Sequence, residues 1–570
     1  MNKRRAKIIL LIVTAFGLII ICRLAYLQIL KCDFYRALAK GQQIISYSIT
    51  PNRGDIFAQD RDGQLYLLAT DEKSEFVFIS PSHLEKEEEV VNFLSESLGI
   101  EKDVISKKIE SKDNSFVVLK KRLSDEELEA INNCDEGSIH VGNEIIRYYP
   151  ESEFASHVIG FVGGEQKGQY GVENFYEEEL KGEEGIAVGE ISRDGYMVFF
   201  DSENSLPVKE GSDLVLTIDF YIQYEAEKLL RQAKENLEIE NGQIVVMNPQ
   251  TGEIKAAASL VDFNPNSYYD YELNSFINPA SQVLFEPGSV FKAVTMAAAI
   301  EEGAINPETT YIDEGFIKIG PDTIHNYSNR SYGECTMTEV LEKSINTGAV
   351  FAEQKISPDK FLDYIKRFGV FEKTGVDTQG EVFSKNEELK KGYEVNFATA
   401  AFGQGIEMTP IQLMRAFSVF ANGGKLIQPY FVDRIINSSE VVLDNKTEVQ
   451  RQVVSEKTAS RVRDMLVSVV ENGFGKKAKV PGYYIAGKTG TAQVAFSSLG
   501  INKSGYSEKT IQTFIGFAPA YSPEFLILVK LDNPNTRTAE YSAVPIFSEL
   551  AEYIVNYYQI PPDYEEEEER

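Results

Sequence analysis

The sequence predicts an α+β fold spread over several domains, and three observations support this prediction. At 570 residues the chain is too long for one compact domain. Its composition, 43% hydrophobic and 25% charged, is typical of folded domains with sizeable cores. Strand-like segments stand at both ends of a largely helical stretch within residues 208–558. We therefore expect an antiparallel sheet whose first and last strands meet, flanked by helices.

The N-terminus predicts a membrane anchor. Basic residues crowd positions 1–7, and an apolar run follows over 8–30 with Arg23 as a main interruption. A helix of that length spans roughly 35 Å, enough for a hydrocarbon layer of about 30 Å. No small-x-small cleavage site follows, which disfavours a cleaved signal peptide, and a bulky residue before Cys22 disfavours lipidation. Because a basic flank stays in the cytoplasm, we expect a single-pass protein of the cell membrane, with its N-terminus inside and the remaining chain outside.

A first extramembrane module is expected over residues 31–207. Short strands alternate there with charged helices, and nothing in its sequence indicates chemistry. Ser124 and Glu127 fit a capping box, which marks the start of a helix. The expected elements are strands over 75–79 and 116–119 and helices over 85–98 and 124–132.

Residues 208–558 form the second expected module, followed by an acidic tail over 559–570. The charge run in that tail is typical of a solvated, disordered segment. The expected elements are a strand over 214–219, a helix over 221–236, hairpin strands over 243–247 and 253–258, helices over 289–302, 337–355 and 410–422, and strands over 483–485, 513–518 and 525–531.

Composition disfavours several classes of function. The net charge of −30 argues against nucleic-acid binding, which needs a basic face. The four cysteines and four histidines are scattered without metal-ligand spacing, so no metal or cofactor site is predicted, although one disulfide stays compatible with the sequence. No histidine lies between residues 344 and 488, so a serine hydrolase in this region needs another base.

Ser289 and Lys292 form a Ser-x-x-Lys motif at the head of the helix expected over 289–302. A helix N-terminus stabilises a developing oxyanion, and a lysine three residues on returns to the same face. Burial among apolar residues would lower the pKa of this lysine, so that its neutral amine could act as a base. A capping serine with a surface lysine is the plainer interpretation of an isolated match. Ser357 and Lys360 form such a match, followed by a helix-starting proline.

Ser344-Ile345-Asn346 is the second motif. Its hydroxyl can relay a proton, and its amide can both donate to and accept from a peptide substrate. The pattern is weak alone, because Ser202 and Asn204 match it equally well within the first module. The motif gains weight from its place after Ser-x-x-Lys and before Lys-Thr-Gly.

Lys488-Thr489-Gly490-Thr491 is the third motif, and we expect it beside an apolar edge strand. Flanking glycines would let a substrate backbone lie close and pair with that strand. The lysine and the threonine hydroxyls could then hold a substrate carboxylate. A second copy over 373–375 lies in a charged, turn-like setting and is expected to be structural.

These three motifs, in this order, are the known signature of penicillin-binding proteins and class A β-lactamases. Residues from about 53 to 553 resemble the class B penicillin-binding proteins, which are membrane-anchored peptidoglycan D,D-transpeptidases. The secondary matches are Arg53-Gly-Asp-Ile56, Asp60-Arg-Asp-Gly63, Gly171-Val-Glu173, Leu216-Thr-Ile-Asp219, Gly403-Gln-Gly405 with Thr409-Pro410, and Gly516-Phe-Ala-Pro519. The resemblance implies the penicillin-binding transpeptidase fold, with an all-helical subdomain and an elongated N-terminal pedestal domain over 31–207.

The resemblance also implies a mechanism. Ser289 would attack the carbonyl between the two terminal D-alanines of a peptidoglycan stem peptide, and an amine of a neighbouring stem would resolve the acyl-enzyme into a cross-link. The backbone N–H groups of Ser289 and Thr491 would form the oxyanion hole, and β-lactams would acylate the same serine. The implied catalytic residues are Ser289, Lys292, Ser344 and Lys488, and the implied substrate-binding residues are Asn346, Thr489, Gly490 and Thr491.

Partners and rival functions follow from the same comparison. Residues 31–210 lack the acidic signature of a glycosyltransferase, so the resemblance implies a separate membrane polymerase of the SEDS family and other division or elongation proteins as partners. A membrane-anchored β-lactamase or β-lactam sensor is an alternative, although the long first module and the long interval from Ser344 to Lys488 argue against a lactamase. A D,D-carboxypeptidase and a non-catalytic scaffold of the division or elongation machinery are further alternatives.

Overall fold

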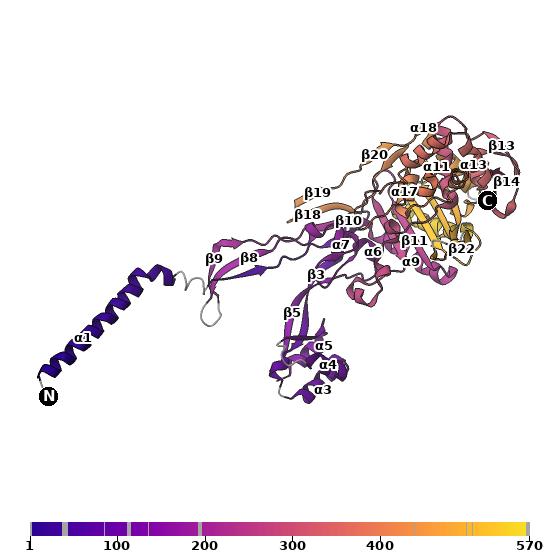
Figure 1. Ribbon diagram of the computed structural model, residues 1–570. Coiled ribbons are helices and arrows are strands. Elements are labelled where there is room, and N and C mark those ends of the chain that lie inside the picture. The colour runs from indigo at the N-terminus through magenta and orange to yellow at the C-terminus, as the bar shows by residue number, and fades with distance from the viewer. Residues whose placement is uncertain are drawn as a thin grey trace. The chain divides into compact units, whose positions relative to one another are not determined.

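The computed structural model describes residues 3–36, 44–84, 86–110, 116–134, 136–191, 197–438, 440–496, 499–503 and 505–565. The chain forms two compact units, one of Met1–Arg53 with Lys181–Gly211 and one of Gly54–Leu180 with Ser212–Arg570 (Figure 1). Residues 54–180 therefore belong to the same compact unit as the C-terminal region. The boundary expected between 207 and 208 stays a prediction, as does disorder of the acidic run, since residues 566–570 lie outside the described ranges.

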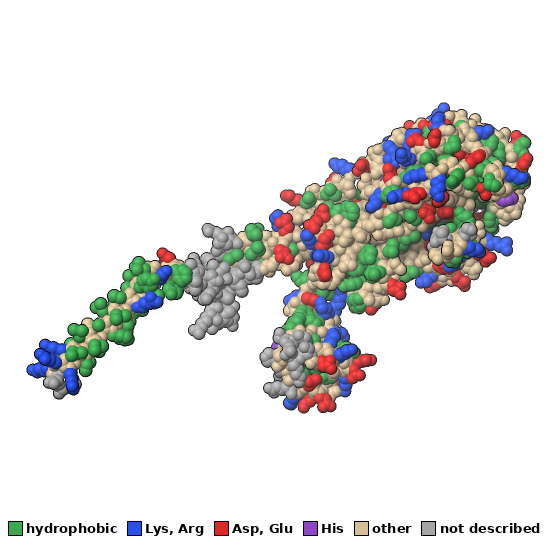
Figure 2. All heavy atoms as spheres, viewed as in Figure 1, with side chains coloured by type: hydrophobic (Ala, Val, Ile, Leu, Met, Phe, Trp, Pro, Cys, Tyr) green, Lys and Arg blue, Asp and Glu red, His purple; other side chains and the backbone are tan. Residues whose placement is uncertain are grey.

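The first unit begins with helix α1 (Lys3–Ala25), which continues as a π-helical turn, η1 (Tyr26–Leu30). By length and composition, Lys3–Leu30 is long and apolar enough to cross a membrane. Figure 2 shows hydrophobic side chains along this helix and basic side chains at its N-terminal end. The unit also holds an antiparallel sheet in the order β1-β8-β9, of strands β1 (Ile44–Ile49), β8 (Gly185–Ile191) and β9 (Met197–Leu206).

The second unit contains a seven-stranded sheet to which both halves of the chain contribute. Strand β10 (Asp213–Asp219) pairs in parallel with β2 and antiparallel with β18, so this strand joins the N-terminal strands in one sheet. The other strands are β2 (Ile56–Gln59), β3 (Leu65–Ile79), β4 (Val117–Lys121), β5 (Ile139–Tyr148), β18 (Val432–Asn437) and β19 (Glu440–Asp444). The expected strands over 75–79 and 116–119 fall within β3 and β4 to within one residue.

A small hydrophobic core lies between β3, β4 and three short helices. These helices are α3 (Glu87–Leu98), α4 (Lys102–Ile109) and α5 (Asp125–Asn132). The expected capping box is confirmed, because Ser124 accepts from the Glu127 backbone while the Glu127 carboxylate accepts from the Ser124 backbone. The expected helix over 85–98 corresponds to α3, with residue 85 outside the described ranges.

Two of the secondary motifs are explained by a buried ion-pair network. The Arg147 side chain, 2% exposed, pairs with Glu173 at 2.8 Å and with Asp71 at 3.2 Å. It also donates to the Gly54 carbonyl at 2.7 Å. A Cβ at Gly54 would lie 1.9 Å from the backbone oxygen of Ser212, so only glycine fits there. These motif residues therefore have a structural role.

The C-terminal region is built on a five-stranded antiparallel sheet in the order β12-β11-β23-β22-β21. Its strands are β11 (Asn241–Met247), β12 (Ile254–Leu260), β21 (Ala486–Ala495), β22 (Tyr506–Ala518) and β23 (Phe525–Asp532). Strands β11 and β23 are neighbours, so strands from the two ends of the region meet as predicted. The first expected strand, over 214–219, is β10 and belongs to the seven-stranded sheet instead. The expected hairpin of β11 and β12 is also confirmed.

Helices cover both faces of this sheet. Along β11, Val245 and Met247 belong to the core that contains α11 (Lys292–Glu301) and α17 (Pro410–Ser418). The alternate residues Ile244 and Val246 belong to the core with α9 (Phe220–Leu237) and α19 (Ala543–Tyr557). This period-2 alternation accounts for the continuous apolar strands of a sheet with no solvated face. Further helices on the first side are α14 (Pro358–Arg367), α16 (Glu394–Ala400) and α18 (Glu456–Asn472).

Five expected elements differ from the structure. The strand expected over 513–518 is the C-terminal part of β22, which begins at Tyr506. The strand expected over 483–485 is wrong, because β21 begins at Ala486 and contains the Lys-Thr-Gly motif itself. The helix expected over 289–302 begins as a 3-10 turn, η5 (Gly288–Phe291), before α11. The helix expected over 410–422 ends at Ser418. The single helix expected over 337–355 is two helices, α12 (Met337–Glu342) and α13 (Asn346–Gln354).

Candidate active site

The nucleophile candidate lies on the turn that leads into α11. Gly288 has a φ of +58°, and its N–H donates to the Gly403 carbonyl at 3.0 Å. A Cβ at Gly403 would lie 2.1 Å from the Gly288 oxygen, so glycine is required at this close approach. Ser289 is half-buried, and Lys292 is fully buried at the first position of α11. Residues three apart in a 3-10 turn share a face, which places both side chains on the same side.

The break between α12 and α13 creates the Ser-x-Asn turn. Ser344 has a φ of +52°, its N–H donates to the Leu341 carbonyl at 3.3 Å, and the Ile345 N–H donates to the Val340 carbonyl at 2.9 Å. This pair of bonds is a Schellman helix end, in which the left-handed position normally holds glycine. Burial of Ile345 fixes the turn, which presents the Ser344 hydroxyl and starts α13 at Asn346. A non-glycine residue in this conformation costs about 1 kcal/mol and is typical of functional sites.

The Ser344 hydroxyl lies between two lysine amines. The Lys292 Nζ lies 3.3 Å from the Ser344 Oγ, and the Lys488 Nζ lies 3.1 Å from the same atom. Lys292 also donates to the Ser344 carbonyl at 2.6 Å and to the Asn346 Oδ1 at 2.8 Å. Three segments that are far apart in the sequence therefore meet at one hydroxyl group.

Burial lowers the pKa of both amines. It lowers the pKa of Lys292 well below its ordinary value, and the nearby positive charge of Lys488 lowers it further. Burial alone lowers the pKa of Lys488 to about 7. A neutral amine donates two hydrogen bonds and keeps one lone pair, which fits the two short contacts of Lys292 with atoms that can only accept. The remaining lone pair is available to take a proton from a hydroxyl.

Strand β21 packs against the turn η5 (Gly288–Phe291), which carries the candidate nucleophile Ser289 and is called the nucleophile turn below. A Cβ at Gly490 would lie 3.0 Å from the Thr513 Oγ1 and 3.2 Å from the Pro287 oxygen, so glycine permits this tight packing. The strand stands at the end of the sheet order, as the sequence predicts for the Lys-Thr-Gly segment. The Lys488 amine also contacts the Thr489 carbonyl at 3.1 Å.

A cleft of about 870 Å³ opens over these groups. Five of the predicted residues line it, namely Ser289, Ser344, Asn346, Thr489 and Thr491. Lys292 and Lys488 lie fully buried beside it, and Gly490 lies within the strand. The expected contact between the Ser289 hydroxyl and Lys292 is not formed as a hydrogen bond within the described part of the chain, since the amine is turned toward residues 344 and 346. The catalytic and binding roles of these residues stay predictions.

Several residues that line the cleft were not predicted from the sequence. They are His325, Asn326, Gln404, Phe474, Arg537 and Tyr541. The Gly403-Gln404-Gly405 match was the one available signal for Gln404. His325 ends strand β15 (Asp322–His325) and Tyr541 ends a 3-10 turn, η9 (Ala539–Tyr541), while the remaining three lie in connecting segments. The place of all five in the cleft depends on tertiary packing. The Asn346 amide also donates to the His325 carbonyl at 3.0 Å, which fixes its orientation.

The duplicate motifs have structural roles. Ser357 caps α14 by accepting from the Lys360 backbone, as expected for a helix start. Thr374, in the second Lys-Thr-Gly copy, is buried, and its hydroxyl donates to Glu381 at 2.6 Å. Ser202 and Asn204 lie in β9, outside the unit that holds the cleft.

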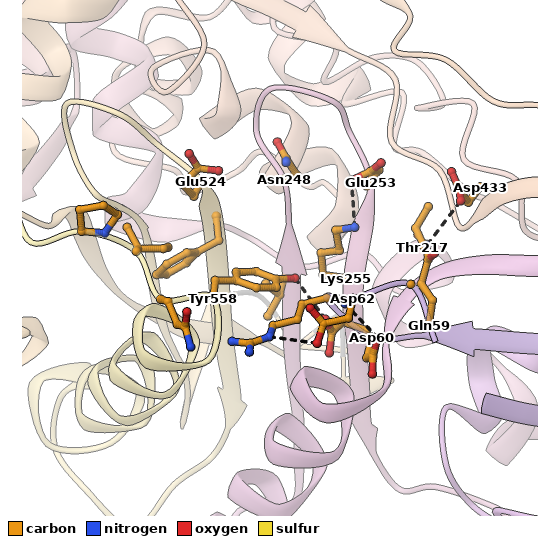
Figure 3. A pocket seen from close by; sticks show the side chains of 18 residues that line it. Gln59, Asp60, Asp62, Thr217, Asn248, Glu253, Lys255, Asp433, Glu524 and Tyr558 are labelled. Atoms are coloured by element: carbon orange, nitrogen blue, oxygen red, sulfur yellow. Dashed lines mark hydrogen bonds and ion pairs between the residues drawn. The ribbon is translucent and has the colours of Figure 1, made fainter. Parts of the chain in front are cut away.

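A second pocket, of about 790 Å³, is lined by several acidic side chains, three of which have partners described below (Figure 3). Glu253 pairs with Lys255 at 2.9 Å, and the Asp219 carboxylate caps α9. The Asp60 carboxylate accepts two backbone N–H groups at 2.9 Å. Among the described residues, no group of three or more His, Cys, Asp and Glu side chains could hold a metal ion.

Comparisons with known proteins agree with this geometry. The family described as "Penicillin binding protein transpeptidase domain" matches residues 242–552, and "Penicillin-binding Protein dimerisation domain" matches residues 48–216. This chain therefore belongs to the penicillin-binding proteins, and its domain composition and relatives place it in class B.

The relatives cover nearly the whole chain. Stage V sporulation protein D of Bacillus subtilis is 33% identical over 539 residues, 93% of this chain and 82% of that protein. A protein named peptidoglycan D,D-transpeptidase FtsI homolog, from Mesostigma viride, is 29% identical over 99% of this chain and 98% of its own length. The crystal structure of penicillin-binding protein 3 from Mycobacterium tuberculosis, complexed with aztreonam, matches with a TM-score of 0.68 and 26% identity, covering 91% of this chain and 98% of that chain.

Proposed function

We propose that this protein is a peptidoglycan D,D-transpeptidase that cross-links stem peptides through an acyl-enzyme on Ser289 and is acylated there by β-lactams. The observation that carries the proposal is the convergence of two buried lysines, both with a lowered pKa, on the Ser344 hydroxyl, in a cleft that Ser289 also lines. The printed names of the relatives support the same activity.

The proposed reaction is acyl transfer without a cofactor. The Ser289 Oγ bonds to the carbonyl carbon of the penultimate D-alanine, and its proton passes to the neutral Lys292 Nζ. The N–H groups of Ser289 and Thr491 stabilise the oxyanion. The bond to the terminal D-alanine then breaks, and Ser344 passes a proton to the leaving amine. An amine of a second stem peptide attacks the ester, forms the cross-link and regenerates Ser289.

The other residues bind the donor peptide. The terminal carboxylate of the donor is bound by Lys488 in its protonated form and by the hydroxyls of Thr489 and Thr491. The Asn346 amide donates to the donor backbone. Gly490 keeps β21 close to the turn that carries the nucleophile, and the free edge of β21 pairs with the extended donor.

The proposal also includes location and partners. Lys3–Leu30 anchors the protein in the cell membrane with its N-terminus in the cytoplasm and the cleft outside. A separate SEDS-family membrane glycosyltransferase supplies the glycan strands, and the two matching families include no glycosyltransferase domain.

The test uses the purified full-length protein with a stem pentapeptide donor and a labelled amine acceptor, read by mass spectrometry. Cross-linked product that contains the label is expected. Release of D-alanine alone would indicate a carboxypeptidase, and rapid hydrolysis of fluorescent penicillin would indicate a β-lactamase. Growth of a depleted strain on Ser289→Ala would support the scaffold interpretation.

A further inference from the structure

One carboxylate near the nucleophile joins three segments of the cleft. The Glu286 Oε1 accepts from the Gly405 N–H at 3.0 Å. The Tyr506 hydroxyl donates to the same carboxylate, with its oxygen 3.3 Å from Oε1 and 3.2 Å from Oε2. Glu286 stands three residues before Ser289, and Tyr506 is the first residue of β22. No other described side chain links the nucleophile turn to both of these segments.

The contact with Gly405 completes a short antiparallel ladder. Phe285 and Met408 exchange backbone hydrogen bonds of 3.0 and 3.1 Å, and the Gly288 N–H donates to the Gly403 carbonyl at 3.0 Å. The Glu286 side chain supplies the contact between these two backbone pairings. Residues 285–288, directly before Ser289, are therefore hydrogen-bonded to residues 403–408 at three positions.

Gln404 lies between Gly403 and Gly405, which are both hydrogen-bonded to the segment before Ser289. It is half-buried and lines the catalytic cleft. Within the described ranges, its side-chain amide has no protein partner, so it is available to a ligand in the cleft. Close packing of Gly403 on Gly288 fixes one side of Gln404, and the Glu286 contact with Gly405 fixes the other.

The contact with Tyr506 reaches the opposite wall of the cleft. Tyr506 pairs with Ala495 at the far end of the β21–β22 hairpin, and β21 carries the Lys-Thr-Gly segment. The same carboxylate therefore ties this hairpin to the nucleophile turn.

Electrostatics make this contact sensitive to pH. Burial raises the pKa of Glu286 to about 7, with a further contribution from the nearby Glu407 carboxylate, while the bonds from Gly405 and Tyr506 favour the ionised form. Both partners donate, so the ionised carboxylate satisfies both of them. A protonated carboxyl group has one acceptor position fewer.

We propose that Glu286 is a positioning residue that, by accepting hydrogen bonds from Gly405 and Tyr506, holds Gln404 and the β21–β22 hairpin in place around Ser289. This proposal rests on the proposed acylation of Ser289. The amide of Gln404, so placed, hydrogen-bonds the backbone amide of the acylating peptide or β-lactam.

A double-mutant cycle tests the shared contact. The wild type, Glu286→Gln, Tyr506→Phe and the double variant are compared by their second-order rate of acylation with fluorescent penicillin. At about pH 8.5 each single change should slow acylation roughly tenfold, the value expected for one charge-assisted hydrogen bond. The double variant should be no slower than the slower single variant, since both changes remove the charge-assisted bond from the Tyr506 hydroxyl to the Glu286 carboxylate.

The pH dependence of the cycle separates positioning from general destabilisation. At about pH 6 the carboxyl group is largely protonated, so the coupling between the two positions should shrink. The titrations of Lys292 and Lys488 occur in all four proteins and cancel in the cycle. Gln404→Ala should weaken the initial binding of penicillin more than the maximal acylation rate, and Glu524→Gln, an exposed carboxylate outside the cleft, should match the wild type.

Additive effects, or a coupling that does not change with pH, would overturn the proposal. If Glu286→Gln fails to fold, as judged by its Tm, the test uses Tyr506→Phe alone. An acylation rate of Tyr506→Phe equal to that of the wild type at both pH values would overturn the proposal. Absence of any adduct on the wild-type protein would refute the proposed function itself, which is a different outcome.

Discussion

Replacing Lys292 with methionine tests the assignment of the base. Methionine keeps most of the length and the apolar stem of the side chain but has no amine, so it offers neither a basic lone pair nor a hydrogen-bond donor. General-base catalysis contributes roughly 10²–10⁴-fold, so acylation of Lys292→Met by fluorescent penicillin should slow by about that factor. The change also leaves the Ser344 carbonyl and the Asn346 Oδ1 without the donors that lie at 2.6 and 2.8 Å. Losing a partner costs about 1–3 kcal/mol for each buried group, and removal of a buried amine offsets part of this cost.

The assay follows covalent labelling by fluorescent penicillin in samples quenched at successive times at fixed pH, and the Tm of each variant is measured in parallel. Lys360→Met is the matched control, because Lys360 belongs to the second Ser-x-x-Lys copy and forms an exposed ion pair with Glu302. This control should label at the wild-type rate. Labelling of a folded Lys292→Met variant within tenfold of the wild type would refute the reasoning, because another group would then have to take the serine proton.

Three further predictions follow from the same contacts. Lys488→Met removes a positive charge near Lys292, so the pKa of Lys292 should rise and the acylation–pH profile should move to higher pH; an unmoved profile measured from pH 6 to 10 would contradict the coupling. The free energy of unfolding of the wild type should rise relative to that of Lys488→Met by about 1.4 kcal/mol per pH unit between roughly pH 7 and 10.5. In this range Lys488 holds a proton in the unfolded chain and has lost it in the folded protein, and urea unfolding at several pH values measures the slope. Ser344→Gly should be about 1 kcal/mol more stable than Ser344→Ala, since the position is left-handed, while both variants acylate slowly without the hydroxyl; equal unfolding midpoints would contradict the strain.

Much of the fold could be predicted because its signals are local. The capping box at Ser124 and the Pro/Gly turn between β11 and β12 each act within a few residues of sequence, and both were confirmed. The apolar continuity of β22 and β23 likewise indicates strands that are buried on both faces. The start of β21 was missed because the motif residues themselves form the strand.

The site was harder to predict where tertiary contacts override local preference. The apolar sequence over 337–355 favours one helix, yet Ser344 adopts a left-handed conformation that ends α12, and no glycine marks the break. Gln404 and Glu286 gain their places only when the 403–408 segment packs on the nucleophile turn. The order of the three motifs predicted that Lys292, Ser344 and Lys488 lie together. The orientation of these side chains depends on the fold and could not be predicted from the sequence.

The most direct test of the central claim is to locate the penicillin adduct. Full-length protein is labelled with a penicillin, digested, and mapped by peptide mass spectrometry, beside Ser289→Ala treated in the same way. We expect a single modified peptide that carries the label on Ser289, and no label on the variant. A stable adduct on any other residue, or an unlabelled wild-type protein, would contradict the claim that the two buried lysines and the Ser344 hydroxyl serve this nucleophile.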